Sequence, residues 1–268
     1  VFVAFGVIAL LLAVIAWLGV RDKPETLGFP SIREMDGKPP HAGRERHWWP
    51  ELLSVLSNRR IWPGFWVNFG MPGTFLAFVG LWAIPFLRDI HGLGRSTASL
   101  YTSLALAGFA CGALFHGWCS DRLGRRKPLL VGGCLLYAAA WLGIVYAGWT
   151  PGPSGSAWFL LMGFSGGSFV LTYAGAKEVA APALSGMAIA LVNTGIFLGA
   201  ALIQPLFGWI MDLSWSGALA NGVRAYGFAD YRAGFYLMLG GVTLSVAASL
   251  FFHETRCRNI TLAEGEPH

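Results

Sequence analysis

Long uncharged apolar runs alternate with shorter polar segments along most of this sequence. Crossing a hydrocarbon layer of ~30 Å takes about 20 mainly apolar helical residues, and seven runs approach or exceed that length. Lipid offers the backbone no hydrogen-bond partners, and the runs lack the alternation of barrel strands, so each run predicts a transmembrane helix. The predicted spans are residues 1–20, 63–87, 97–117, 129–149, 157–176, 185–211 and 233–252.

Composition agrees with an all-α polytopic membrane protein. Hydrophobic residues make up 55% of the chain and charged residues only 12%, whereas about one quarter is charged in ordinary soluble domains. The first run has no basic residue before it and no small-residue cleavage site before the polar segment that follows. It is therefore predicted to be a true span and not a signal peptide.

Lysine and arginine are distributed unevenly between alternate connections. Residues 21–62, 118–128, 177–184 and 253–268 hold 15 of the 19. Positive loops are retained on the cytoplasmic side, so these four segments, with the C-terminus, are predicted to be cytoplasmic. The net charge of +5 then reflects topology. The basic loops also lack the aromatic interleaving expected for base stacking, so no nucleic-acid partner is predicted.

The connection between the third and fourth spans carries the most specific motif. Residues 117–128 read GWCSDRLGRRKP, which resembles the pattern G-x-x-x-D-R-x-G-R-[RK]-[RK] of the major facilitator superfamily of transporters. In that family the pattern marks the loop between the second and third helices of each six-helix half, and here it follows the second span after the long loop. The matching positions are Gly117, Asp121, Arg122, Gly124, Arg125, Arg126 and Lys127.

Physical chemistry gives this pattern a rationale. Gly117 permits close helix packing, Gly124 supplies a turn, and Asp121 can pair with a nearby arginine or sit at the positive end of a helix. The three final basic residues are expected to hold the loop on the cytoplasmic side and to contact anionic headgroups. The resemblance implies that the loop of Asp121 packs against the other half and helps to set the balance between inward and outward states. The alternative is a plain positive loop with chance spacing.

The resemblance also implies how the chain is organised. VRDKPETLGFP at residues 20–30 is similar to the exit from the sixth helix of a complete transporter, and residues 177–212 are similar to its tenth-to-eleventh connection and eleventh helix. An MFS-type six-helix bundle plus one preceding helix is expected, in a truncated sequence without helices one to five. The expected parts are the last helix of the N-terminal half at 1–20, a cytoplasmic inter-domain loop at 21–62, the C-terminal half at 63–252 and a cytoplasmic tail at 253–268.

Two features are expected within the inter-domain loop. KPPHAG at residues 38–43 indicates a flexible segment. WWPELLSVLSNRRIWP at residues 48–63 combines tryptophans and leucines with two arginines, which predicts a short helix on the membrane surface. The start of the next span is an equal alternative for this second stretch.

A member of this family is implied to be a secondary active transporter that moves a small solute by alternating access. Such proteins rock two halves about a site near the bilayer midplane. The implied partners are the lipid bilayer, a small-molecule solute and the missing N-terminal half. A coupling proton stays open, because a proton-coupling carboxylate is expected in the other half. The predicted location is the plasma membrane, or the inner membrane of a bacterium, and no cofactor is predicted.

Polar side chains within the spans are the candidates for contact with the solute. Polar groups in a bilayer face a cavity or bond a neighbouring helix, and interhelical bonding is the simpler role for any single one. Pro72 and Gly73 are predicted to bend or loosen the second span. The cavity candidates are Asn68, Thr74, Trp82, Tyr101, Tyr173, Asn193 and Gln204, with Asn68, Tyr173, Asn193 and Gln204 favoured. Lys177 and Glu178, at the cytoplasmic end of the fifth span, are interfacial residues and candidates for a cytoplasmic gate.

Small residues and cysteines are assigned no chemistry. Two GxxxG patterns, at residues 108–112 and 195–199, predict close helix packing. The four cysteines have neither CxxC nor zinc spacing, so neither a disulfide nor a metal site is predicted.

Two functions of other classes compete with transport. GFSGG at residues 163–167 matches the G-x-S-x-G of serine hydrolases, and its first four residues resemble the GxSG of rhomboid proteases. However, Ser165 is expected halfway down a span, away from any histidine base. A glycine-rich packing face is therefore predicted, with no catalytic residue. A non-transporting scaffold or receptor remains the other alternative, because fold does not establish function.

Overall fold

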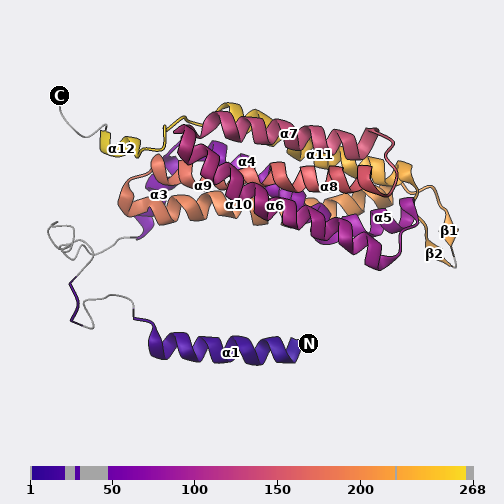
Figure 1. Ribbon diagram of the computed structural model, residues 1–268, viewed down its shortest axis with the longest axis horizontal. Helices are drawn as coiled ribbons and strands as arrows, with labels where there is room; N and C mark the ends of the chain where they lie inside the picture. The colour runs from indigo at the N-terminus through magenta and orange to yellow at the C-terminus, as the bar shows by residue number, and fades with distance from the viewer. Residues whose placement is uncertain (1, 22–27, 31–47, 221, 264–268) are drawn as a thin grey trace. The chain divides into compact units, whose positions relative to one another are not determined.

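The structure is a computed structural model that describes residues 2–21, 28–30, 48–220 and 222–263 (Figure 1). The chain divides into two compact units, Val1–Trp48 and Trp49–His268. The first unit contains α1 (Phe2–Gly19), an uninterrupted apolar helix that lies within the first predicted span but is shorter than the six candidate membrane spans described below, so its role as a span stays a prediction. The KPPHAG stretch lies outside the described residues.

The second unit is a bundle of helices. Within the described residues, six helical segments are long and apolar enough to cross a membrane, and they match the six later spans predicted from the sequence. Three are unbroken or nearly so, and three are built from several pieces. In chain order the elements are α4 (Trp62–Ala77), η2 (Phe78–Trp82), α5 (Ala83–His91), α6 (Arg95–Leu123), α7 (Lys127–Tyr146), α8 (Pro153–Gly166), η3 (Gly167–Phe169), α9 (Val170–Glu178), η4 (Pro182–Leu184), α10 (Ser185–Leu213) and α11 (Phe228–Leu250).

Two short helices and a β hairpin precede, connect or follow these spans in the chain. Helix α3 (Trp48–Ser57) covers the stretch predicted as a surface helix, and its Val55 packs in a small cluster with Ile61, Val179 and Val192. A two-stranded antiparallel hairpin, β1 (Leu219–Ala220) and β2 (Val223–Arg224), connects α10 to α11. Helix α12 (Ile260–Ala263) follows the last span. The position of α3 on a membrane surface stays a prediction.

Glycines bring two pairs of helices into close contact. A Cβ added to Gly112 of α6 would collide with the backbone of Phe164 in α8, and one added to Gly199 of α10 would collide with the backbone of Phe69 in α4. Without Cβ atoms at these positions the helix backbones approach closely, which is how membrane helices associate without a hydrophobic driving force. The GxxxG patterns therefore pack α6 on α8 and α10 on α4.

The second predicted span departs from a regular helix, but not where the sequence indicated. Helix α4 runs without interruption through Pro72 and Gly73, and the departure is the π-helical turn η2 further on. A Cβ at Gly73 would lie 3.1 Å from the Cα of Gly199, so tight packing on α10 supports the helix at this point. The Trp82 indole N–H at the end of η2 donates to the Gln204 carbonyl across 3.0 Å.

An aromatic core fills the part of the bundle nearest the β hairpin. The ring of Phe78 lies 5.0 Å from that of Trp141, and Phe86 lies 5.0 Å from Phe235. At its edge the Tyr231 hydroxyl donates to Asp89 Oδ2 over 2.6 Å. These contacts join η2, α5, α7 and α11, so this region of the bundle is packed as one unit.

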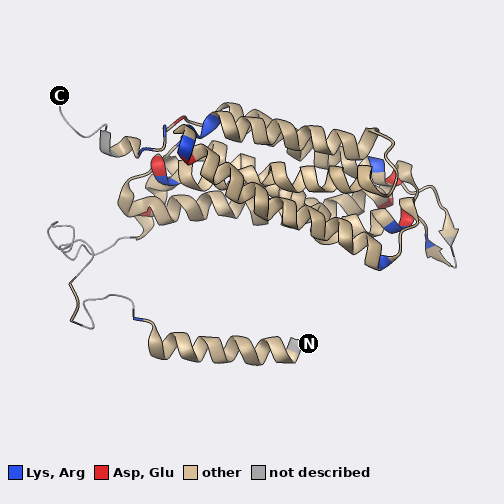
Figure 2. Ribbon diagram, viewed as in Figure 1, with Lys and Arg blue, Asp and Glu red and all other residues tan. Residues whose placement is uncertain are grey.

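Charged residues gather at the two ends of the bundle (Figure 2). One end holds the α6–α7 loop, the end of α9 and the segment after α11, and is called the basic end below. The opposite end holds the β hairpin and the α5–α6 connection. This separation is the distribution expected of an integral membrane protein, because charged groups within the hydrocarbon region are costly.

Candidate functional site

The motif loop between α6 and α7 is a tight turn at the basic end. Helix α6 ends at Leu123, and Gly124 adopts the left-handed conformation with φ of 64°. The Arg125 N–H then donates to the Ser120 carbonyl at 3.3 Å. Glycine carries no Cβ penalty in this region of φ, so Gly124 supplies the turn that the motif suggested.

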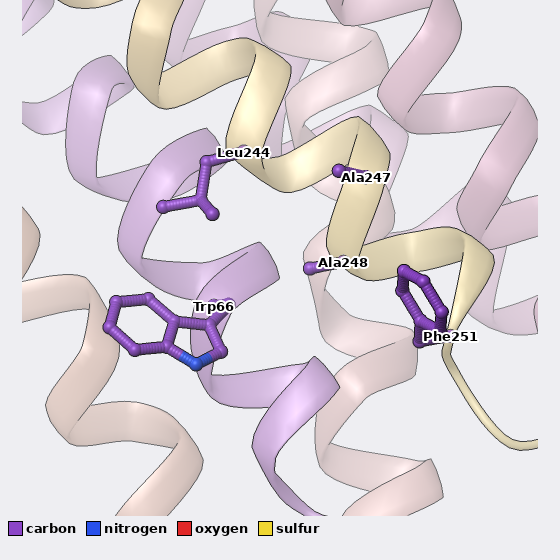
Figure 3. A pocket seen from close by; sticks show the side chains of 5 residues that line it. All are labelled: Trp66, Leu244, Ala247, Ala248 and Phe251. Carbon is purple, nitrogen blue, oxygen red and sulfur yellow. The ribbon is translucent and has the colours of Figure 1, made fainter.

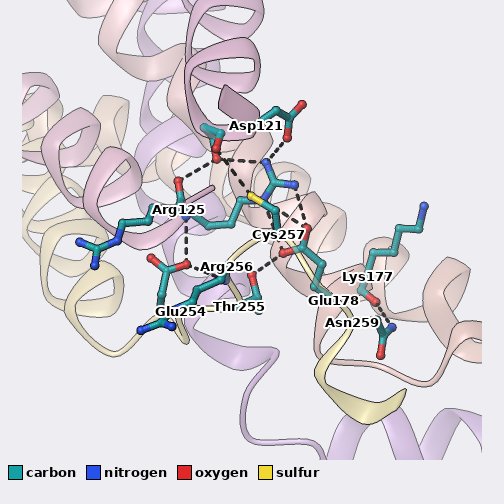
Figure 4. A network of polar contacts seen from close by, with 11 residues as sticks. Asp121, Arg125, Lys177, Glu178, Glu254, Thr255, Arg256, Cys257 and Asn259 are labelled. Atoms are coloured by element: carbon teal, nitrogen blue, oxygen red, sulfur yellow. Dashed lines mark hydrogen bonds and ion pairs between the residues drawn. The ribbon is translucent and has the colours of Figure 1, made fainter. Parts of the chain in front are cut away.

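Arg126 is the centre of an ionic network, and Figure 4 labels its partners Asp121 and Glu178. The surface of Arg126 is only 8% exposed. Nη1 lies 2.5 Å from Asp121 Oδ1, and Nη2 lies 2.8 Å from Glu178 Oε1. Nη1 also donates to the Ser120 hydroxyl at 3.0 Å. The expectation that Arg126 contacts headgroups is thus wrong, because two carboxylates hold its guanidinium inside the protein.

The segment after α11 closes this network. The Thr255 hydroxyl donates to Glu178 Oε2, and the Glu254 carboxylate accepts the backbone N–H groups of Arg126 at 3.1 Å and Lys127 at 3.2 Å. The Asn259 side chain donates to the Lys177 carbonyl at 3.0 Å. The loop, the end of α9 and the C-terminal segment are therefore tied together by side chains from all three.

Opposing effects set the charge states of this network. Burial alone lowers the pKa of the Arg126 guanidinium, but the hydrogen bonds with Glu178 and Asp121 outweigh it and raise the pKa above its ordinary value. Burial likewise favours the neutral form of Glu254, yet backbone N–H donors from Arg256, Arg126 and Lys127 lower the pKa of its carboxyl. Arg126 is therefore cationic, and Glu254 is favoured as an anion.

The other motif positions behave differently. Arg122 and Arg125 are exposed, and the Arg122 guanidinium lies over the Trp118 ring with 5.8 Å to its centroid. Lys127 is half-buried at the start of α7. A Cβ added to Gly117 meets no atom within 4 Å, so close packing does not explain this glycine within the described residues. The packed glycine face of α6 instead lies at Gly108 and Gly112.

Three cavity candidates lie inside the bundle, where their polar atoms bond other helices and connections of the bundle. Asn68 Nδ2 donates to the Val192 carbonyl at 3.1 Å, and its Oδ1 accepts from Thr172 at 3.0 Å. The Thr74 hydroxyl is 3.0 Å from the Tyr137 hydroxyl. The Tyr101 hydroxyl accepts the Gly152 N–H at 2.7 Å. These groups connect neighbouring helices, and their role toward a solute stays a prediction.

Four other cavity candidates are half-buried and form two pairs along α10. Gln204 Nε2 reaches the Leu76 carbonyl at 3.4 Å, while its own carbonyl accepts the Trp82 indole N–H. Nearer the basic end, the Tyr173 hydroxyl donates to Asn193 Oδ1 at 2.5 Å. Their partial exposure leaves both pairs accessible from outside the bundle. The structure thus separates the seven candidates into a buried group and an accessible group.

The two gate candidates also have different environments. Glu178 is buried in the network with Arg126, whereas Lys177 is exposed. Ser165 is fully buried and donates to the Leu161 carbonyl at 2.7 Å. A Cβ at the neighbouring Gly163 or Gly167 would collide with the backbone of α6. GFSGG is therefore a helix-packing face.

Some members of the network were not found from the sequence. Ser120, Glu254 and Thr255 all contribute side chains to it. An acid placed just after the last span, at residue 254, is the one signal that was present. Within the described residues, no group of three or more His, Cys, Asp or Glu side chains is arranged to hold a metal ion.

Comparison with known proteins decides the family. The Major Facilitator Superfamily profile matches residues 71–266. The chain belongs to this superfamily. Its members are membrane transporters, so the protein is an integral membrane protein of a transporter family and not of an enzyme family.

Individual relatives cover much of the chain. It is 25% identical over 271 residues to the glycerol-3-phosphate transporter of Haemophilus influenzae, covering 90% of this chain and 52% of the relative. It is 30% identical over 199 residues to a chloramphenicol resistance protein of Pseudomonas aeruginosa, covering 70% of this chain and 42% of the relative. The inward-open xylose transporter XylE from E. coli superposes with a TM-score of 0.52 at 15% identity, covering 81% of this chain and 48% of that one. The chain spans about half the length of the curated relatives it matches.

Proposed function

We propose that these helices act as one half of a secondary transporter that moves a small solute by alternating access. The observation that carries the proposal is the network in which the buried Arg126 of the family's loop motif pairs with the exposed Asp121 of the same motif and with the buried Glu178 of α9. The network joins the loop to α9 and to the segment after α11, so the basic end of this half moves as a unit. Transporters of this kind rock one rigid half against another about a central site, and a tied end suits that motion.

The proposed partner of this half is a second six-helix half. The chain aligns with only about half of the length of each relative, which supports this arrangement. Asp121 is itself largely exposed, with 69% of its side chain accessible, although it is paired with Arg126. We place the contact with the second half on this exposed side of the loop, where it biases the balance between inward and outward states.

Lys177 is the better candidate for a gate on this half. The Glu178 carboxylate is bonded to Arg126 and Thr255. The neighbouring Lys177 is exposed. A gate must form and break contacts within each cycle, and an exposed cation does so at little cost. Glu178 is therefore assigned to holding the network, and Lys177 to contact across the halves.

This half is proposed to contact its solute through uncharged groups. Charged residues of the described spans lie near the helix ends (Figure 2). The accessible groups on α10 are the amides of Asn193 and Gln204, with the Tyr173 hydroxyl and the Trp82 ring next to them. Relatives are described as transporting glycerol 3-phosphate or conferring chloramphenicol resistance. If the solute is a phosphate ester, its counter-charge belongs to the other half.

Uptake by cells tests this proposal. The complete reading frame that encodes these residues is expressed, and accumulation or efflux of radiolabelled glycerol 3-phosphate, xylose and chloramphenicol is measured. We expect flux of at least one solute, lost in Asn193→Ala and retained in Thr194→Ala, since Thr194 is exposed and bonds its own helix. Residues 1–268 alone, reconstituted in liposomes, should not transport.

Two results count against the proposal. Intact flux in Asn193→Ala rejects the assigned contact site. Absence of any solute flux, together with normal membrane insertion, favours the scaffold alternative. The orientation has its own check: a C-terminal alkaline phosphatase fusion should be inactive, because the C-terminus is proposed to be cytoplasmic at the plasma membrane.

A further inference from the structure

A hollow on the outer surface of the bundle lies between α4 and α11. Its volume is about 270 Å³, and it is lined by Trp66, Leu244, Ala247, Ala248 and Phe251 (Figure 3). Leu244, Ala247, Ala248 and Phe251 follow one face of α11 into its end, and Trp66 faces them from α4. The lining is apolar except for the indole N–H, so this groove suits a hydrocarbon occupant.

The position of the groove along the spans is well defined. Trp66 lies four residues into α4, and Phe251 directly follows the last residue of α11. With a rise of 1.5 Å per helical residue, Trp66 is about 6 Å from the helix end. The groove therefore lies near the ends of α4 and α11 at the basic end, at the level where acyl chains are expected to meet their ester groups.

The size and chemistry of the groove favour a narrow chain. Sites for compact solutes usually measure about 300–1,000 Å³ and enclose most of the ligand, whereas this hollow is smaller and lies on the bundle surface. Trp66 and Phe251 remain 40% and 78% exposed. No hydrogen bond of the Trp66 indole N–H is found among the described residues. That donor is available to an ester or phosphate oxygen, as for tryptophans at membrane interfaces.

Exposed arginines lie within seven residues of the groove lining along the chain. Arg59 is exposed seven residues before Trp66, and Arg256 and Arg258 are exposed five and seven residues after Phe251. Seven residues of chain reach at most about 25 Å. The nearest acid in this segment, Glu254, already accepts backbone N–H groups. An anionic headgroup is therefore the complementary partner at this level.

We propose that this groove binds one acyl chain of an anionic phospholipid from the leaflet at the basic end. The chain lies against Trp66, Leu244 and Phe251, the indole N–H donates to an ester or phosphate oxygen, and the nearby arginines hold the charged headgroup. The site is distinct from the Tyr173–Asn193 and Trp82–Gln204 pairs. Its occupancy concerns lipid and not solute, so it can be tested without measuring transport.

Native mass spectrometry of the purified protein in detergent tests the site. Phosphatidylglycerol and phosphatidylcholine with the same acyl chains are added in turn, and the lipids retained per protein are counted. We expect one phosphatidylglycerol to be retained in preference. Arg59→Gln should reduce this preference about fivefold, since one basic residue near an anionic surface contributes about that factor.

Filling the groove gives the sharper comparison. Ala247→Trp places a ring in the hollow and should weaken retention of the bound lipid about tenfold, by excluding about two buried methylenes. Ala139→Trp is the matched control, because Ala139 is an exposed alanine on α7 outside the groove. Trp66→Phe keeps an aromatic ring but removes the donor, and should weaken retention without loss of fold.

Clear outcomes overturn the proposal. Equal retention of the two lipids by the unaltered protein removes the anionic preference. Equal retention by the Ala247→Trp and Ala139→Trp variants removes the groove as the site. If Ala247→Trp fails to fold, as judged by circular dichroism, unchanged retention in Trp66→Phe and Arg59→Gln together rejects the assignment.

Discussion

The two ends of the bundle each carry an arginine–carboxylate pair of nearly the same length, yet the pairs are not equivalent. Arg126 and Glu178 lie 2.8 Å apart with side chains 10% and 11% exposed, and Arg224 and Asp212 lie 2.9 Å apart with 51% and 49% exposed. Distance alone therefore does not measure how much such a pair contributes to stability. Burial determines how strongly each end depends on its pair.

Solvent explains the difference between the ends. An exposed pair exchanges water for a partner at little net gain and is screened by salt. A buried pair has lost its hydration, so removing one member strands the other as an uncompensated charge. The basic end therefore cannot open without cost, whereas the hairpin end can rearrange its charges freely.

The largest effect is expected from Arg126→Ala. Glu178 would be left buried without its cation, which typically costs about 3–5 kcal/mol of unfolding free energy. Chemical unfolding of the detergent-solubilised protein measures the loss. Arg122→Ala serves as the control, because Arg122 is exposed and outside the network, and it should leave stability unchanged. Similar losses in both variants would contradict the assigned role of burial.

Thr255→Val is expected to have a smaller effect at the same end. Valine keeps the shape of the side chain but removes the hydroxyl that donates to Glu178. Loss of a hydrogen bond to a charged acceptor costs about 1.5–3 kcal/mol, and the remaining partner Arg126 places the result near the lower limit. The same unfolding measurement detects it. A neutral result would show that Arg126 alone satisfies Glu178.

Acid should weaken the contact between the segment after α11 and the α6–α7 loop, which Glu254 makes through the N–H groups of Arg126 and Lys127. The folded state lowers the pKa of Glu254, so its contribution to stability is present above the unfolded pKa of about 4.3 and is lost as pH falls through the folded value. Protease sensitivity of the segment after α11 should rise over this acidic range. Glu254→Gln should flatten that pH dependence, and an unchanged profile in this variant would exclude Glu254 as its source.

The smallest effect is expected at the hairpin end. Asp212→Asn removes the charge that faces Arg224, but both side chains are half in solvent. We expect no measurable change in stability at physiological salt. A loss comparable to that of Arg126→Ala would mean that burial does not distinguish the two pairs.

The sequence was sufficient for the spans and the loop, since both depend on local patterns. Apolar run length predicted the six later helices, and Gly124 was recognised as the turn residue. The environment of Arg126 was missed because its partner Glu178 is 52 residues away, and a motif read along the chain contains no information on that approach. For the same reason, spacing alone did not show that Asn68 is bonded inside the bundle.

Two other differences between the sequence-based predictions and the structure also arise from contacts between helices. Gly117 and Gly112 are both small residues on α6, but only Gly112 meets another helix in the described residues, and their order in the sequence does not reveal which face is covered. Pro72 was expected to disturb its helix, whereas the departure lies at Phe78–Trp82. The sequence of that turn has no proline, and its cross-helix bonds to α10 are tertiary.

The π turn at Phe78–Trp82 amounts to one inserted residue within an otherwise regular helix. Each residue advances an α-helix by about 100°, so everything after the insertion is rotated relative to α4 by that angle. Deleting a single residue from the turn would restore a continuous helix but would carry Asp89 about 100° away from Tyr231. The rotation of α5 about its axis relative to α11 thus depends on the number of residues in the turn, and not on the identity of any one side chain.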